Sequence, residues 1–228
     1  MARGARRPRN RFAALAQPLN LIAIQLSGRS NLENLTQGTL VSSYKPIRED
    51  LHRLAYATYL LELFDKSSEG ATETGELFVM LLTVLELVSY SNALDLVRRA
   101  TEMKLMASLG FRPQLLYCIY CQETLDNKNP LGYNVSEGGF VCPKCHSHSL
   151  SSNSKAIVCS GAGRQLLHDL QVVNLAKLDV LSPSFARTKK DCLIQVDVIL
   201  HESIRAHLGS LPKAADFLES IGQGSTLF

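Results

Sequence analysis

Four of the six cysteines stand in two closely spaced pairs. Cys118 and Cys121 form the first CxxC pair, Cys142 and Cys145 form the second, and 20 residues separate the two pairs. Each CxxC turn can direct two thiolates at one point, and two such pairs complete the four-cysteine shell of a zinc ribbon. A closed shell leaves no position for a reacting water molecule. The spacing therefore predicts one structural Zn²⁺ ion rather than a catalytic one.

Two other interpretations of these cysteines are open. The pairs could form two disulfides in an oxidising compartment, although no secretory signal supports such a location. One pair could be redox-active, although a surrounding βαβ pattern is absent from the sequence. His146 and His148 could each replace a thiolate as a metal ligand. Cys159 and Cys192 lie among apolar or small residues, so we predict that both are small buried side chains.

Basic residues concentrate at the start of the chain. Residues 1–48 contain eight Lys or Arg and one acidic residue, whereas the whole chain has a formal net charge of +3. Five of these basic residues are Arg3, Arg6, Arg7, Arg9 and Arg11. Guanidinium groups bind phosphate oxygens and stack on unpaired bases, so these arginines are candidates for DNA binding. The alternative is a solvated tail.

The apolar pattern changes character at Pro46. Before it, residues 19–26 and 35–43 have the length and composition of strands. After it, apolar residues recur at helical spacing in three consecutive segments that end near Gly110, which predicts a helical bundle. The chain is therefore expected to be an α+β protein.

Individual helix ends can also be predicted. Pro46 is a favourable first residue for the first helix, with Glu49 and Asp50 in its first turn and Leu51 on its buried face. Asn92 is expected to cap the third helix. The buried face of the second helix is expected to consist of Leu77, Leu81, Val84, Leu85 and Val88.

Residues 112–150 interrupt the helical period and contain all four paired cysteines. Gly138 and Gly139 predict a hairpin turn, and the apolar pair that follows them predicts a short strand. Helices are expected to resume at about 163–175, 191–208 and 213–221.

The sequence contains no motif of the common enzyme classes. It has neither a GxxxxGK[ST] phosphate loop nor a GxSxG nucleophile elbow. His201 and Glu202 begin like a zinc-protease helix, but Arg205 stands where the second histidine belongs. We therefore expect no covalent catalysis.

No apolar run reaches the ~18–20 residues of a membrane span. A mitochondrial transit peptide is an alternative for the basic start, although Pro8 and Pro18 interrupt any long amphipathic helix there.

Taken in order, several segments resemble the RecO family of bacterial recombination mediators, in its zinc-bearing form. The segments are Ala2–Phe12 with Gln17-Pro18-Leu19, Leu35-Thr36-Gln37, Tyr59–Leu63, Leu109–Pro113, Gly138–Cys142, His207-Leu208-Gly209 and Phe217-Leu218-Glu219. The resemblance spans nearly the whole chain. Family members begin with further residues that supply the first strands of a five-stranded OB barrel. The resemblance therefore implies a partial, basic, DNA-binding OB-fold at 1–45 and a mostly helical domain at 46–228, with an inserted zinc ribbon at 112–150.

The resemblance also implies a function. A member of this family binds single- and double-stranded DNA, anneals complementary strands and helps the recombinase RecA load onto DNA coated by single-strand-binding protein. The implied partners are RecR and the acidic tail of the single-strand-binding protein, with RecA as an indirect partner. Arg98 and Arg99 could face such a tail. The implied location is the bacterial cytoplasm, in association with the nucleoid and with no membrane.

Two functions of other classes remain as alternatives. One is a nucleic-acid-binding module of a transcription or ribosome-associated protein, built on the four-cysteine zinc site, which would prefer a defined sequence or RNA. The other is an enzyme whose site carries no recognisable motif, and such a site would require an acid, base or nucleophile with a perturbed pKa in a pocket.

Overall fold

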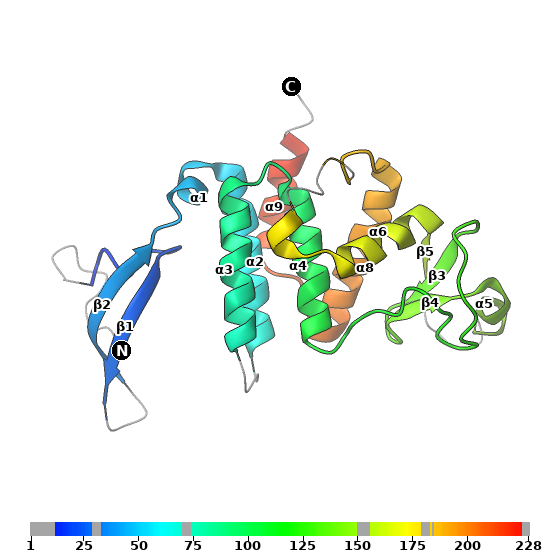
Figure 1. Ribbon diagram of the computed structural model, residues 1–228, viewed down its shortest axis with the longest axis horizontal. Helices are drawn as coiled ribbons and strands as arrows, with labels where there is room; N and C mark the ends of the chain where they lie inside the picture. The colour runs from blue at the N-terminus through cyan, green and yellow to red at the C-terminus, as the bar shows by residue number, and fades with distance from the viewer. Residues whose placement is uncertain are drawn as a thin grey trace. The chain divides into compact units, whose positions relative to one another are not determined.

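The computed structural model describes residues 12–28, 33–69, 74–149, 156–178, 183 and 185–224, with side chains omitted at 147–149 and 222–224. The chain divides into two compact units, Met1–Leu54 and Ala55–Phe228 (Figure 1). The predicted α+β class is confirmed, because a small β segment precedes a mostly helical part that contains the cysteine cluster. No helix in the described ranges is long and apolar enough to cross a membrane.

The first unit contains an antiparallel hairpin of β1 (Leu21–Ser27) and β2 (Asn34–Ser42). Both strands agree closely with the predicted ones. Ile22 lies opposite Leu40 and Ile24 lies opposite Gly38, so apolar side chains of the two strands share one face of the sheet. A Cβ atom at Gly38 would lie 2.8 Å from the Cδ1 atom of Leu15, so Leu15 packs closely over this point of β2. The assignment of this hairpin to a partial OB-fold stays a prediction.

The predicted single helix that starts at Pro46 is wrong, because Asp50 interrupts it. Helix α1 (Lys45–Glu49) ends there, and α2 (Leu51–Ser68) begins on the other side. Asp50 is extended, and its carboxylate accepts a hydrogen bond of 3.1 Å from the backbone N–H of Arg53. An aspartate in this conformation caps a new helix rather than extending the old one. Leu51, expected on the buried face, is 59% exposed in the first turn of α2.

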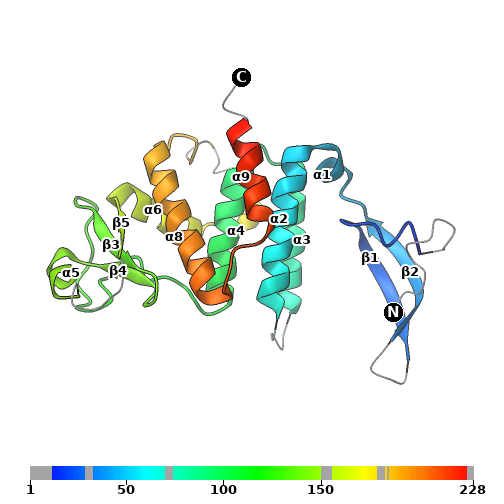
Figure 2. The ribbon, with the colours of Figure 1, turned by 180° about the vertical axis from the view of Figure 1, so that it is seen from behind.

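Helices α3 (Gly75–Tyr90) and α4 (Leu94–Ser108) continue the predicted bundle and lie side by side (Figures 1 and 2). Four of the five residues predicted for the buried face of α3 are buried; Leu81 is only half-buried. The predicted cap at Asn92 is wrong, because α4 begins after Ala93. Ala93 is the N-cap residue and its side chain forms no capping hydrogen bond, while its own N–H donates to the Ser91 hydroxyl at 3.1 Å. Gly110, with a φ of 89°, follows α4.

The second half of the chain contains a small sheet and the remaining helices. The sheet has the order β4-β3-β5 and is antiparallel. Its hairpin turn at Gly138-Gly139 was predicted, whereas the third strand was not. The elements are β3 (Leu131–Asn134), β4 (Gly139–Val141), α5 (Pro143–Ser149), β5 (Ile157–Cys159), α6 (Gly161–Val172), the 3-10 helix η1 (Leu175–Lys177), α8 (Lys190–Leu208) and α9 (Ala214–Gly224). The three helices predicted after the cysteine-containing segment are thus α6, α8 and α9, with small shifts at their ends.

A chain of buried polar contacts joins α2, α4 and α8. Asp197 of α8 accepts hydrogen bonds from Nε and Nη2 of Arg99 at 2.8 and 2.7 Å, and from Nη2 of Arg98 at 2.7 Å. Arg98 also contacts the buried carboxylate of Glu102 at 2.9 Å, which in turn accepts a hydrogen bond of 2.7 Å from the Tyr59 hydroxyl of α2. Charged groups this deep in a protein are tolerated only when paired.

These contacts correct the expectation that Arg98 and Arg99 face a partner's acidic tail. The two residues are only 5% and 7% exposed, and carboxylates of the same chain satisfy them. Burial raises the pKa of Asp197, but the two guanidinium groups outweigh burial and hold that pKa below its usual range. Carboxylate and guanidinium groups are therefore charged together at neutral pH.

Replacing Asp197 by Asn should lower the free energy of unfolding by roughly 3 kcal/mol, because buried Arg98 and Arg99 lose the carboxylate that they share. Denaturant unfolding followed by circular dichroism measures the change. The matched control is Glu202→Gln, which breaks an exposed pair with Arg205 on the same helix and should cost less than about 1 kcal/mol. Equal, small effects of the two substitutions would contradict this account.

The ion pairs of Asp197 with Arg98 and Arg99 also predict that the stability of the fold depends on pH. Since the folded-state pKa of Asp197 lies below its unfolded value, ionisation stabilises the fold at pH values above the unfolded value. That stabilisation is lost as the pH falls through the folded-state pKa. Acid unfolding should therefore be less steep in the Asp197→Asn variant than in the wild type.

Candidate metal centre

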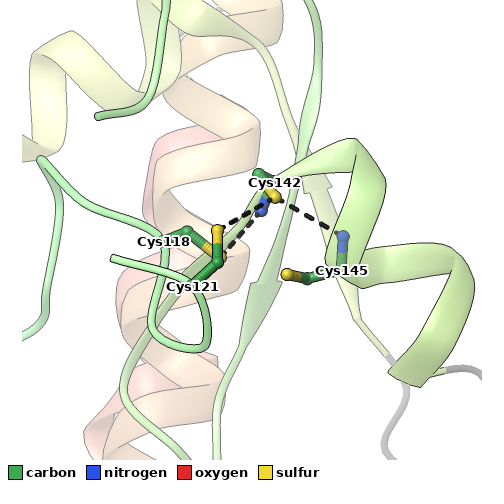
Figure 3. Close-up of side chains that lie close together, drawn as sticks. All are labelled: Cys118, Cys121, Cys142 and Cys145. Atoms are coloured by element: carbon green, nitrogen blue, oxygen red, sulfur yellow. Dashed lines mark hydrogen bonds between the residues drawn. The ribbon is translucent and has the colours of Figure 1, made fainter. Parts of the chain in front are cut away.

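The four paired cysteines converge on one point (Figure 3). Cys118 and Cys121 come from the loop before β3, whereas Cys142 precedes α5 and Cys145 lies in its first turn. All four Sγ atoms lie within 4.8 Å of one another, and those of Cys121 and Cys142 are 3.6 Å apart. Zn–S bonds of about 2.3 Å place tetrahedral sulfur atoms about 3.8 Å apart. The cluster could thus hold one metal ion, and its all-sulfur donor set fits Zn²⁺.

The alternative of two disulfides does not describe this arrangement. All six cysteines are free thiols, and the 3.6 Å between the Cys121 and Cys142 sulfur atoms far exceeds a disulfide bond of about 2.05 Å. His146 is not part of the cluster; its ring packs against Gly132, where a Cβ atom would lie 2.7 Å from Cδ2. The side chain of His148 lies outside the described residues.

Backbone N–H groups stabilise the thiolate form of Cys118, which is the form that binds a metal. The N–H of Cys142 points at the sulfur of Cys118 at 3.4 Å. Burial raises the pKa of Cys118, but backbone N–H groups of Cys142, Cys121 and Tyr120 outweigh burial and lower it to about 6. Cys118 is therefore largely a thiolate at neutral pH.

Cys145 has the opposite tendency. Its hydrogen bond with Cys142, followed by burial, raises its pKa to about 12. Four neighbouring thiols cannot all ionise unless a cation neutralises the accumulated charge. A bound Zn²⁺ ion would supply that charge, and the protons displaced from the thiols would be released.

The loop that carries the first pair of cysteines is bonded to the edge of the small sheet. The N–H of Ile119 donates to the carbonyl of Phe140 at 3.0 Å, and the N–H of Phe140 donates to the carbonyl of Gln114 at 3.2 Å. A Cβ atom at Gly139 would overlap the Ile119 side chain. Glycine is therefore required at this position for the loop to approach β4 closely.

One residue that sequence reasoning missed anchors this loop to the helices. Arg164 of α6 is buried, and its guanidinium donates to the carbonyls of Leu115 at 2.5 Å and Leu125 at 3.0 Å. It also donates to the side chain of Asn127. A signal existed in the sequence, since Arg164 stands three residues before Leu167, on the apolar face of α6.

The remaining predicted site residues have mixed outcomes. Cys159 and Cys192 are buried as predicted. Arg3, Arg6, Arg7, Arg9 and Arg11 all lie outside the described residues, so their role in DNA binding stays a prediction.

Comparison with known proteins decides the family. The family model described as "Recombination protein O C terminal" matches residues 48–212. The chain belongs to the RecO family. A second RecO model, "Recombination protein O N terminal", matches residues 1–44. The metal centre thus lies within the C-terminal region of a RecO chain.

Individual relatives agree with the family models. The chain is 33% identical over 224 residues to the DNA repair protein RecO of Symbiobacterium thermophilum, covering 97% of this chain and 85% of that protein. It is 26% identical over 221 residues to the DNA repair protein RecO of Halalkalibacterium halodurans, covering 97% and 82%. The resemblance predicted from the sequence is confirmed, and membership of the RecO family supports a role in DNA repair by recombination.

Purified, reduced protein should contain one zinc ion per chain. Cys142→Ser should weaken zinc binding by more than about 100-fold and unfold the module locally, because metal-binding energy is folding energy in such modules. Plasma mass spectrometry measures the zinc, and circular dichroism should show that the helices persist. Cys192→Ser, at a buried cysteine outside the cluster, is the control and should retain zinc. Zinc-free wild-type protein with six free thiols would contradict the assignment.

Zinc affinity should fall as the pH falls. The thiol of Cys145, with its pKa of about 12, must lose a proton when the metal binds. At least one proton is then released at neutral pH, so affinity should decrease about tenfold for each pH unit of acidification. Calorimetric titration in buffers of different ionisation enthalpy counts the released protons. An affinity that is constant between pH 6 and 8 would show that the thiols are not displaced in this way.

Proposed function

We propose that this RecO protein is a recombination mediator that binds single- and double-stranded DNA and anneals complementary strands. We further propose that it helps a recombinase load onto DNA coated by single-strand-binding protein, without catalysing covalent chemistry itself. The observation that carries the proposal is the match to RecO family models over residues 1–44 and 48–212. The proposed protein partners are RecR, the tail of the single-strand-binding protein and, indirectly, RecA.

The basic start of the chain supports a DNA-binding role for residues 1–45. We propose that Arg3, Arg6, Arg7, Arg9 and Arg11 contact phosphates and do not read bases. Arginine forms charge-assisted hydrogen bonds with phosphate oxygens, and each contact releases counterions from DNA. Such contacts position a protein on DNA without conferring sequence preference.

Annealing follows from this charge neutralisation. Two complementary strands repel each other through their phosphates, and bound arginines reduce that repulsion. Base pairing then supplies the free energy, so no nucleotide hydrolysis is needed. This agrees with the lack of a phosphate-loop motif in the sequence.

The proposed zinc ion has a structural role in this account. Cys118, Cys121, Cys142 and Cys145 would complete its coordination, so no ligand position remains for substrate. When bound, the ion neutralises the thiolates and holds the loop of the first pair against the start of α5. The expected cytoplasmic, nucleoid-associated location stays a prediction.

Replacing the five N-terminal arginines by Ala should weaken binding to single-stranded DNA and slow annealing. Five phosphate contacts contribute about −3.5 to the slope of log affinity against log salt concentration, and the variant should lose most of that contribution. Fluorescence anisotropy at several salt concentrations measures the slope. Annealing of complementary strands coated with single-strand-binding protein, without ATP, measures the activity.

A control with equal charge loss separates a local effect from a general one. Five exposed basic residues of the second unit serve for this: Lys128, Arg187, Lys189, Lys190 and Lys213. Replacing these by Ala should change the slope and the annealing rate much less. If the N-terminal variant anneals as fast as the wild type at every salt concentration, the basic start is only a solvated tail. Strong preference for RNA or for one DNA sequence would instead favour a transcription or ribosome-associated module.

A further inference from the structure

Helix α3 exposes more apolar surface than its position in the bundle explains. Phe78, Val79 and Tyr90 are 50%, 63% and 69% exposed, while other apolar residues of the same helix are buried against the bundle. A helix with apolar residues on more than one side is normally covered on more than one side. Phe78 and Val79 are neighbours in the first turns of α3, and adjacent exposed apolar side chains of this kind mark a candidate interaction site.

The exposed side of α3 borders a groove shared with α2. The groove has a volume of about 520 Å³, and its apolar lining comes from both helices. That lining consists of Leu61, Phe64, Leu77, Phe78 and Leu81. All of these residues belong to the second unit. The groove therefore has the apolar walls that accommodate the anchor side chains of an amphipathic helix.

The charge around the groove is negative. Among the described residues that line it, Asp65 alone is charged, and Glu76 is exposed in the first turn of α3 beside Leu77. Neither carboxylate forms an ion pair with a residue that the structure describes. Helix α3 contains two glutamates and no Lys or Arg in its sequence.

The negative charge around the groove restricts which molecules can bind there. Nucleic acid and an acidic protein tail would both be repelled. A second copy of the chain placed face to face would bring the same carboxylates together. The arginine-rich segment of this chain, residues 2–11, has no large apolar side chain that could fill the groove. The occupant that satisfies both surfaces has apolar anchors and flanking basic residues.

We propose that the groove between α2 and α3 docks a basic amphipathic helix of a protein partner. Apolar anchors at i, i+3 or i+4 and i+7 enter the groove, and Lys or Arg side chains on either side meet Asp65 and Glu76. This function is separate from DNA binding by residues 1–45 and from the metal centre. An acidic protein tail would therefore bind to a different surface of the chain.

The test uses the full chain and a labelled peptide of about 18 residues, long enough for about five helical turns. The probe carries Leu at amphipathic spacing and Lys elsewhere. One control peptide replaces each Lys by Glu, and a second scrambles the Leu–Lys order. Fluorescence anisotropy should show that the amphipathic Leu–Lys peptide binds at least about tenfold more tightly than either control.

Two variants locate the binding. Phe78→Ser removes an apolar wall, and the double variant Asp65→Lys/Glu76→Lys reverses the charge; each should weaken peptide binding about tenfold or more. All three positions are exposed or line an open groove, so the fold should be retained. The matched controls are Val172→Ser, at an exposed apolar residue of α6, and Glu137→Lys, at an exposed acid of the β3–β4 turn, and both should bind like the wild type.

Three outcomes would overturn the proposal. The first is equal affinity for the basic amphipathic peptide and either control peptide. The second is unchanged affinity in both groove variants. The third is a dimer, detected by sedimentation velocity, that Phe78→Ser dissociates, because it would assign the groove to a second copy of the chain. None of these outcomes depends on DNA binding, so failure here would leave the proposed function standing.

Discussion

The repulsion among four thiolates is the constraint on which the cysteine module depends. Their sulfur atoms lie within 4.8 Å of one another, and the strands that support them are only three or four residues long. The apolar side chains of β3 and β4 are buried, but a module this small still needs another source of folding energy. A Zn²⁺ ion would convert the electrostatic penalty into attraction, and it would do so only if all four ligands are present.

The helical part of the same unit neutralises its buried charge within the protein. Asp197 faces two guanidinium groups, and Glu102 is bonded to both Arg98 and Tyr59. This network fixes the packing of α2, α4 and α8 and leaves those arginines unavailable to partners. Arg164 then connects the helices to the loop of the first cysteine pair. The second unit thus neutralises charge in two ways. The cysteine cluster would do so through a bound metal, and the helices do so through ion pairs.

Local patterns were the part of this structure that the sequence could predict. The CxxC spacing identifies the four ligands because neighbouring residues in a tight turn present two of them together. Apolar periodicity located α3, α6, α8 and α9, because residues three or four positions apart lie on the same face of a helix. Prediction failed where a distant residue decided the outcome and where two local interactions competed. The burial of Arg98 depends on Asp197, 99 positions away, and the break at Asp50 depends on competition between capping and helix extension, which periodicity does not detect.

X-ray absorption at the zinc edge of the purified protein tests the central claim most directly, because it counts the donor atoms around the metal. The account predicts four sulfur neighbours at about 2.3 Å and no nitrogen or oxygen in the first coordination sphere. The Cys142→Ser protein should lose this signal together with its metal. A wild-type spectrum with two or three sulfur neighbours and a nitrogen or oxygen at about 2.0–2.1 Å would contradict the account, because a histidine or water would then complete the site.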